Sequence, residues 1–110
     1  MGTFAVGDVV IVPFPYADFS RYKKRPALVV GRAEFDNLIL CQITSKAETS
    51  KRAILLSDTD FAKGTLNLES FIRFDKTFTV EPFILEGKAG SLKTEKTRLV
   101  QSKIREIFSN

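Results

Sequence analysis

The sequence contains no histidine and no tryptophan, and Cys41 is the single cysteine among its 110 residues. Without histidine, neither a Ser-His-Asp nor a Cys-His catalytic arrangement can form, and a histidine-based zinc site is excluded. One cysteine cannot form an internal disulfide, and Cys41 lies within an apolar run, where a cysteine usually acts as a small hydrophobic residue. Any chemistry must therefore come from other side chains.

Long hydrophobic runs and targeting signals are also missing. No stretch approaches the ~20 apolar residues of a membrane-spanning helix, and the N-terminus lacks the basic start and apolar core of a signal peptide. The chain has no GxxxxGK[ST] loop to cradle phosphates. We therefore expect a cytoplasmic protein without membrane association and without a cofactor.

Asp58 and Asp60 are separated by one residue, a spacing that could suggest a pair of metal ligands. No further carboxylate or imidazole accompanies them at ligand spacing. We interpret them as turn and capping residues and expect no metal site.

Length and charge set the remaining bounds. A chain of 110 residues is near the commonest domain size, so residues 1–110 are expected to form one domain with its own core. The net charge of +4 and the pI of about 9.4 favour a polyanionic partner, although many basic proteins bind no nucleic acid.

Short apolar runs of strand length recur along the chain, separated by turn-forming residues. They occupy residues 8–12, 27–30, 38–43, 53–56, 70–74 and 78–85. Pro13 and Pro15 lack the N–H that a sheet requires, so the first strand ends or reaches an edge there. Pro82 marks the last run as another edge strand.

The fifth apolar run, residues 70–74, has the alternating pattern of a strand whose successive side chains point to opposite faces. Phe71 and Arg73 are expected on one face of this strand, and Ile72 and Phe74 on the other. Residues 17–24, 31–37 and 44–52 carry turn-forming, polar or basic residues and are interpreted as loops.

The C-terminal segment changes from a strand period to a helical one. Its apolar residues fall on one helical face and predict an amphipathic helix over residues 94–108: Leu99, Val100, Ile104, Ile107 and Phe108. Thr94 is the expected N-cap, and Glu95 suits the positive end of the helix dipole. Several short strands followed by one helix predict a mainly β fold, a small barrel with a C-terminal helix.

Arg25 and Thr44 stand where the two basic loops join predicted strands. A guanidinium binds phosphate in bidentate fashion, and a threonine hydroxyl can bond a phosphate oxygen. Together with the loop aromatics, which can stack on unpaired bases, these residues favour binding of single-stranded RNA, with phosphate-transfer chemistry as a further option. The alternative is that the basic loops are only solvated and that Arg25 pairs with a carboxylate such as Asp75.

Three segments carry a resemblance to a known family. GDVVIVPFPYADFSRYKKRPALVV (residues 7–30) contains a Gly-Asp-x-Val start and an Arg-Pro strand start, LILCQITS (residues 38–45) ends in Ile-Thr-Ser, and residues 63–76 include a Ser, an Arg and an Asp-Lys pair. With these motifs, nearly the whole chain resembles the MazF/PemK family, the toxins of type II toxin–antitoxin systems. The resemblance implies an SH3-like barrel of the MazF/PemK/CcdB type that forms a homodimer.

The resemblance also implies an activity. Such a protein would be a metal-independent, sequence-selective endoribonuclease, an mRNA interferase, in which the 2′-hydroxyl of single-stranded RNA attacks the adjacent phosphate. Its partners would be RNA and a cognate antitoxin. By motif, the catalytic residues would be Arg25, Thr44, Arg73 and Asp75, and the RNA-binding residues would be Arg21, Tyr22, Lys23, Lys24, Ser45, Lys46, Lys51, Arg52 and Ser70.

The chain departs from the family in one respect, because some PemK-like members use a histidine near the first loop. The alternative function is a catalytically silent barrel of the same fold that binds RNA, DNA or a protein. A gyrase poison of the CcdB kind is disfavoured, since those proteins act through an ending that includes a tryptophan.

Overall fold

The structure is a computed structural model, and it describes residues 4–15, 22–46 and 52–109. Seven strands form one antiparallel sheet in the order β4-β6-β3-β2-β1-β7-β5. The strands are β1 (Asp8–Pro15), β2 (Tyr22–Arg32), β3 (Leu38–Thr44), β4 (Ala53–Leu56), β5 (Phe61–Gly64), β6 (Ser70–Val80) and β7 (Gly87–Leu92). Three short 3-10 turns, η1 (Glu34–Asp36), η2 (Asp58–Asp60) and η3 (Pro82–Ile84), and one helix, α1 (Thr94–Ile107), complete the described part of the chain.

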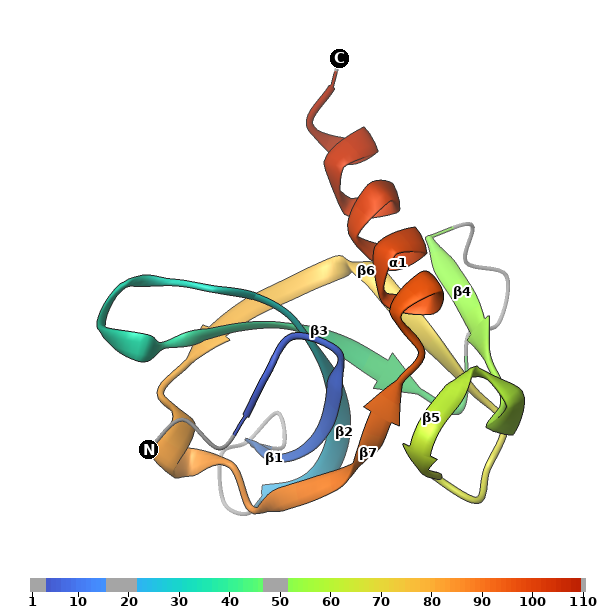
Figure 1. The fold of residues 1–110 in the computed structure, drawn as a ribbon. Coiled ribbons are helices and arrows are strands. Elements are labelled where there is room, and N and C mark those ends of the chain that lie inside the picture. The colour runs from blue at the N-terminus through green and yellow to red at the C-terminus, as the bar shows by residue number, and fades with distance from the viewer. Residues whose placement is uncertain (1–3, 16–21, 47–51, 110) are drawn as a thin grey trace.

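The sheet curls on itself into a half-barrel, with α1 rising from one side (Figure 1). Its two outermost strands, β4 and β5, are consecutive in the chain and are joined only through residues 57–60. The expected mainly β barrel with a C-terminal helix is confirmed. No helix in the described part of the chain is long and apolar enough to cross a membrane.

Alternation along the strands creates two apolar layers, one on each face of the sheet. On the first face, Leu28, Cys41 and Ile72 are fully buried in one cluster with Val100 of α1. On the second face, Val10 and Leu40 belong to another buried cluster, which is covered by the half-buried residues Phe4, Phe78, Val80, Ile84 and Leu85. Because α1 packs on β2 and β6, the first face is closed to solvent where the helix lies.

The close approach of β5 to β7 depends on two glycines that lie opposite each other, Gly64 and Gly90. A Cβ on Gly90 would overlap the carbonyl oxygen of Lys63, and one on Gly64 would overlap that of Ala89. Gly64 also has φ +73°, a conformation that residues with a Cβ rarely adopt. These positions therefore require glycine.

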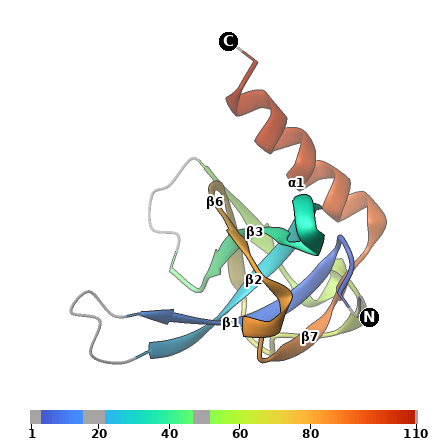
Figure 2. The ribbon, with the colours of Figure 1, turned by 90° about the vertical axis from the view of Figure 1, so that its left-hand side faces the viewer.

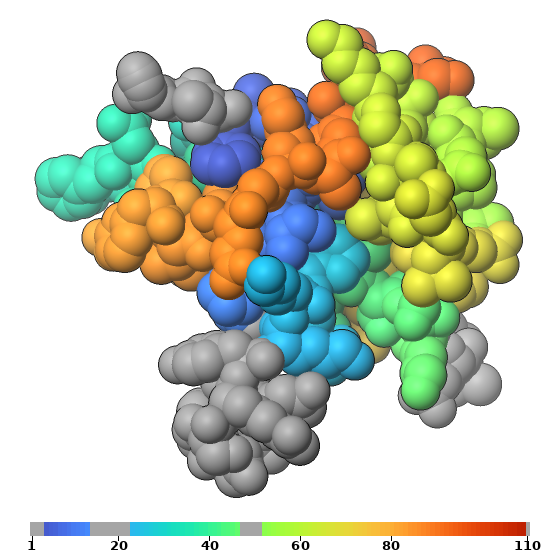
Figure 3. All heavy atoms as spheres, turned by 90° about the horizontal axis from the view of Figure 1, so that it is seen from below, coloured from blue at the N-terminus to red at the C-terminus, as the bar shows by residue number. Residues whose placement is uncertain are grey.

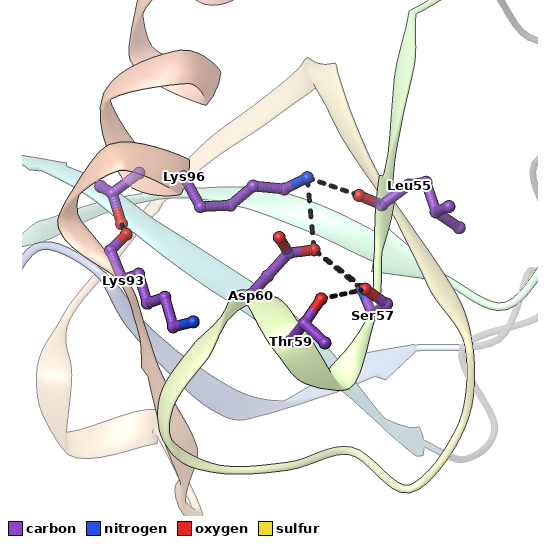
Figure 4. A network of polar contacts seen from close by, with 7 residues as sticks. Leu55, Ser57, Thr59, Asp60, Lys93 and Lys96 are labelled. Atoms are coloured by element: carbon purple, nitrogen blue, oxygen red, sulfur yellow. Dashed lines mark hydrogen bonds and ion pairs between the residues drawn. The ribbon is translucent and has the colours of Figure 1, made fainter.

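The start of α1 is attached to the segment that follows β4 by a network of polar contacts (Figure 4). The Lys96 ammonium donates a hydrogen bond of 2.7 Å to the carbonyl oxygen of Leu55 and lies 3.3 Å from the Asp60 carboxylate. Asp60 also accepts a 2.9 Å hydrogen bond from the backbone N–H of Ser57, in a capping box around η2. Asp58 accepts a hydrogen bond from the Thr65 hydroxyl. The interpretation of both aspartates as turn and capping residues is confirmed.

The strand boundaries differ from the expected ones around the first loop. β2 begins at Tyr22, so residues 22–24, expected as loop, form ladder pairs with residues 13–15 of β1. Pro13 does not end β1, which continues to Pro15 as its last residue, and among the described residues its pairing with β7 stops at Ile11. Both prolines thus lie where β1 has β2 as its one described neighbour, which is the edge position expected for them.

Two other predictions were wrong in detail. Residues 78–85 do not form one strand, because β6 ends at Val80 and Pro82, with its fixed φ, begins η3. The helix starts with Lys93 rather than Thr94 as its N-cap, and no side chain caps it. Of its predicted apolar face, Val100 is buried, whereas Leu99 and Phe108 are exposed.

Candidate functional site

Three strand ends meet at one end of the sheet: the start of β2, the end of β3 and the start of β6. They border a groove of about 290 Å³, which Figure 3 shows between the cyan, green and yellow segments. Six residues predicted from the sequence as site residues line it: Lys23, Lys24, Arg25, Thr44, Ser45 and Ser70. Pro26, Ile43, Leu66 and Leu68 supply its apolar wall. The groove thus combines cations, hydroxyls and apolar surface.

The pairing register explains how Arg25 and Thr44 come together. Ala27 lies opposite Gln42, and Gln42 lies opposite Arg73, so these three residues form a row across one face of the sheet. Two residues further along, on both β2 and β3, are Arg25 and Thr44. Neighbouring strands are about 4.8 Å apart and alternate residues share a face, so these two side chains lie side by side.

Arg73 and Asp75 do not line the groove, but they belong to the same face of the sheet. Thr44 lies opposite Phe71, which makes Arg73 its diagonal neighbour, at a Cα separation of about 7–8 Å. The predicted alternation along β6 is confirmed, since Ile72 and Phe74 are buried while Phe71 and Arg73 are half-buried on the opposite face. Arg73 therefore lies next to Thr44 on this face, while the pair stays outside the lining of the groove.

Arg73 and Asp75 form a two-pronged ion pair. The Nε and Nη2 atoms of Arg73 each donate a hydrogen bond of 3.1 Å to one carboxylate oxygen of Asp75. Desolvation raises the pKa of Asp75, but the hydrogen bonds and the charge of Arg73, with smaller effects from its own backbone and Lys76, outweigh it and lower the pKa below its usual value. Asp75 is therefore ionised at neutral pH, which makes it a weak base.

Arg25 is half-buried, and no carboxylate of the described residues forms an ion pair with it. The alternative in which Asp75 neutralises Arg25 is contradicted, because Asp75 pairs with Arg73. Arg25 thus lines the groove, and no described carboxylate neutralises its charge.

The hydroxyls of the groove are held by local bonds. The Thr44 oxygen accepts a 3.1 Å hydrogen bond from the backbone N–H of Lys46, in a turn that ends β3. The buried Ser70 donates 2.9 Å to the carbonyl of Leu68 and so shapes the loop before β6. The Thr44 hydroxyl also lies 3.4 Å from the carbonyl of Lys46, so it must turn away from this weak bond to donate to a ligand, whereas Ser70 acts as a structural residue of the groove.

The other predicted RNA-binding residues vary in position. Lys23 and Ser45 are exposed at the groove, and Lys46 is exposed just after Ser45 but does not line it. Lys24 is exposed with its ammonium 2.9 Å from Glu86. Arg52 is exposed just before β4, and its carbonyl accepts a bond from the N–H of Phe74. Tyr22 is the first residue of β2. Arg21 and Lys51 lie outside the described residues.

Other chemistries find little support in this part of the molecule. Burial raises the pKa of the Cys41 thiol to about 12, so it is not a nucleophile at neutral pH. Within residues 4–15, 22–46 and 52–109, no three His, Cys, Asp or Glu side chains gather as metal ligands would. Phosphate binding by Arg25 and its neighbours is the chemistry that the groove favours.

The comparison with protein families supplies the decisive observation. The model of a family described as "PemK-like, MazF-like toxin of type II toxin-antitoxin system" matches residues 5–108. The chain belongs to this family. Among curated proteins, none matches the chain.

Solved structures of MazF proteins share the fold of this PemK/MazF-like chain. A MazE–MazF complex from Deinococcus radiodurans (Form-II) is similar at 18% identity with a TM-score of 0.76, covering 98% of this chain and 97% of that chain. The Mycobacterium tuberculosis toxin MazF-mt6 is 22% identical with a TM-score of 0.68, covering 92% and 95%. An endoribonuclease in complex with its cognate antitoxin from Mycobacterial species is 13% identical with a TM-score of 0.74, covering 96% and 95%.

Reasoning from the sequence missed part of this PemK/MazF-like groove. Leu66 and Leu68 line it from the connection between β5 and β6, a segment without a strand or helix period. Gln42 and Phe71 lie in the cross-strand rows with Arg73 and Thr44. The alternation of β6 already set Phe71 on the face of Arg73, but the pairing with β3 is a property of the folded sheet.

Proposed function

We propose that this toxin is a metal-independent, sequence-selective endoribonuclease that cleaves single-stranded mRNA in the cytoplasm. The observation that carries the proposal is the juxtaposition of Arg25 and Thr44 at a groove where Arg25 forms no ion pair with a described carboxylate. Membership of the PemK/MazF toxin family supports the same conclusion. A solved structure with this fold carries the name endoribonuclease.

In the proposed reaction, the 2′-hydroxyl oxygen of one nucleotide attacks the adjacent phosphorus and the bond to the 5′-oxygen of the next nucleotide breaks. The products are a 2′,3′-cyclic phosphate and a free 5′-hydroxyl. Negative charge accumulates on the phosphoryl oxygens in the transition state. A fixed guanidinium stabilises such charge, and loss of one comparable donor lowers kcat by roughly 10²–10³-fold. Arg25 takes this role, and Thr44 bonds a phosphoryl oxygen.

Proton transfer falls to the Arg73–Asp75 pair, since the chain has no histidine. A phosphate that draws Arg73 away from Asp75 removes the interaction that lowers the pKa of the carboxyl. Asp75 then becomes a better base for the 2′-hydroxyl proton, and water protonates the leaving 5′-oxygen. RNA binding and activation of the base are thereby coupled in this scheme.

The partners follow from the same comparison. Structures with this fold include MazE–MazF complexes and an endoribonuclease with its cognate antitoxin. We propose that a cognate antitoxin covers the groove and that the toxin acts as a homodimer. Lys23, Lys46 and their basic neighbours hold the RNA backbone through its phosphates.

The test is cleavage of a long single-stranded RNA in the presence of EDTA, with the new ends mapped chemically. The wild-type protein should leave 2′,3′-cyclic phosphate and 5′-hydroxyl ends at a restricted set of sequences. Arg25→Ala should lower the rate by roughly 10²–10³-fold, and Arg25→Lys should recover only part of it, because a lysine cannot bind phosphate in bidentate fashion.

Arg105→Ala is the matched control, since Arg105 is an exposed arginine on the last turn of α1 and its loss should leave cleavage unchanged. Equal cleavage by Arg25→Ala and wild type would contradict the assignment, as would a requirement for metal. Tight binding of RNA or DNA without cleavage would instead favour a catalytically silent barrel.

A further inference from the structure

Two phenylalanines stand exposed at the opposite end of β3 from the groove. Phe35 lies in η1, between β2 and β3, and is 90% exposed, while Phe83 lies in η3, after β6, and is 80% exposed. Leu38 at the start of β3 pairs with Val80 at the end of β6, so both turns leave the sheet at the same end. Figure 2 shows η1 and η3 on the side that faces the viewer.

The backbone at Phe35 is in a conformation that a phenylalanine rarely adopts. Phe35 has φ +61° and ψ +32°, and the next residue, Asp36, has φ +62°. The turn is closed by a 3.1 Å hydrogen bond from the N–H of Asn37 to the carbonyl of Glu34. Two successive residues with positive φ form the tight hairpin turn for which Asn-Gly is the favoured sequence. A large aromatic residue there adds strain, and such strain is concentrated at functional sites.

The charges around these rings are acidic, although the whole chain carries +4. Glu34 and Asp36 flank Phe35, and Glu81 precedes η3. All three are exposed, and none of them forms an ion pair with a described residue. The nearby Arg32 donates a 2.7 Å hydrogen bond to the carbonyl of Phe4 and keeps its positive charge, so the three carboxylates outnumber it.

We define the acidic aromatic surface as Glu34, Phe35, Asp36, Glu81 and Phe83. Its excess of negative charge disfavours RNA, because phosphates would be repelled. It also disfavours a two-fold contact between copies of this chain, in which the same carboxylates would meet across the axis. A positively charged partner gains from the carboxylates, and its cations can also lie against the faces of the exposed rings.

We propose that the acidic aromatic surface binds a cationic, amphipathic segment of another protein, with apolar anchors against Phe35 and Phe83 and lysines or arginines near the carboxylates. Exposed aromatic rings supply large contact area and are enriched among residues that dominate binding energy. The surface lies apart from the basic groove, so one molecule could hold RNA and this partner together. The inference does not depend on nuclease activity.

The experiment measures binding of a short fluorescent helical peptide of lysine and leucine to the full-length protein by anisotropy. A peptide with glutamate in place of lysine is the control probe. The lysine peptide should bind and the glutamate peptide should not. Phe35→Asn combined with Phe83→Ser should weaken binding about tenfold or more. Because asparagine accepts the turn conformation, the thermal stability of this variant should be equal to wild type or higher.

The charge contribution has its own pair of variants. Glu34→Gln with Glu81→Gln should weaken the lysine peptide several-fold and flatten the salt dependence, whereas Glu69→Gln with Glu106→Gln, exposed carboxylates elsewhere, should not. Equal binding of both peptides, or equal effects of both charge variants, would overturn the proposal. So would sedimentation data in which Phe35→Asn with Phe83→Ser dissociates a homodimer, since the surface would then be a contact between copies.

Discussion

The Lys96 network between α1 and β4 offers a direct test of how the helix is held. Lys96→Met keeps most of the aliphatic stem and removes only the ammonium. The change leaves the Leu55 carbonyl without its 2.7 Å donor and removes the 3.3 Å ion pair with Asp60. Asp60 keeps its hydrogen bond from Ser57. The substitution therefore measures the contribution of the Lys96 ammonium and its two contacts, separately from the rest of the network.

The size of the loss follows from the exposure of the groups. A hydrogen bond from a charged donor contributes about 1.5–3 kcal/mol when buried, and an exposed ion pair contributes up to about 1 kcal/mol. The Lys96 side chain is only 15% exposed, but its ion-pair partner Asp60 is 23% exposed, so the pair is partly screened by water. We expect Lys96→Met to lower the free energy of unfolding by about 1–2 kcal/mol and the melting temperature by about 5–10 °C.

The assay is urea unfolding followed by circular dichroism, with Lys103→Met as the matched control. The Lys103 side chain is 43% exposed and its ammonium lies 3.9 Å from Glu106, so its loss should change the free energy of unfolding by less than about 0.5 kcal/mol. The slope of the free energy against urea should stay the same, since the same surface is exposed on unfolding. If both variants unfold at the same urea concentration as wild type, Lys96 does not anchor the helix.

Two further predictions concern the sheet and the ion pair beside the groove. Gly90→Ala should lower the free energy of unfolding by about 2 kcal/mol or more, because the new Cβ would overlap backbone that cannot move aside. Gly31→Ala is the control in the same urea assay. A Cβ at Gly31 would meet only ordinary contacts near 3.7 Å, so its effect should be mild by comparison. The lowered pKa of Asp75 means that its pair with Arg73 stabilises the fold above the unfolded-state pKa of about 3.9 and loses this effect as pH falls through the lower folded-state value. The free energy of unfolding of Asp75→Asn should therefore be lower than that of wild type at pH 7, by less than about 1 kcal/mol. This difference should disappear in acid. A difference that grows in acid would contradict the lowered pKa of Asp75.

Much of the sheet could be predicted from local pattern because its central strands are apolar. Residues 53–56 were predicted with the observed boundaries, and residues 38–43 with one residue missing at the end. β5 and β7 were missed, since their sequences FAKG and GKAGSL contain no apolar run. These strands form because a curled sheet brings a backbone partner close to them, and that partner is more than twenty residues away in the sequence.

In the candidate site, too, some features could be predicted from local sequence and others depend on how the strands pair. Thr44 ends β3 as expected, whereas Arg25, expected where a loop joins a strand, lies inside β2 opposite Val12. The motifs of the family marked both residues. Their shared face depends on the register between β2 and β3, with Ala27 opposite Gln42, and this register is a tertiary property. The pairing of Asp75 with Arg73 rather than with Arg25 also follows from that arrangement, because i and i+2 on one strand point to the same side.

The short connection between the two outermost strands has a consequence for solubility. A sheet edge with unpaired N–H and C=O groups is a template for aggregation, and natural proteins protect such edges. Here β4 and β5 are the two outer strands and are adjacent in the chain through η2. The Lys96 ammonium donates a hydrogen bond to the carbonyl of Leu55 in β4, and the N–H of Lys93 donates one to the carbonyl of Asp60 just before β5. The N-cap and the first turn of α1 thus bond one backbone carbonyl beside each edge, which leaves fewer free groups for a strand of another molecule to pair with.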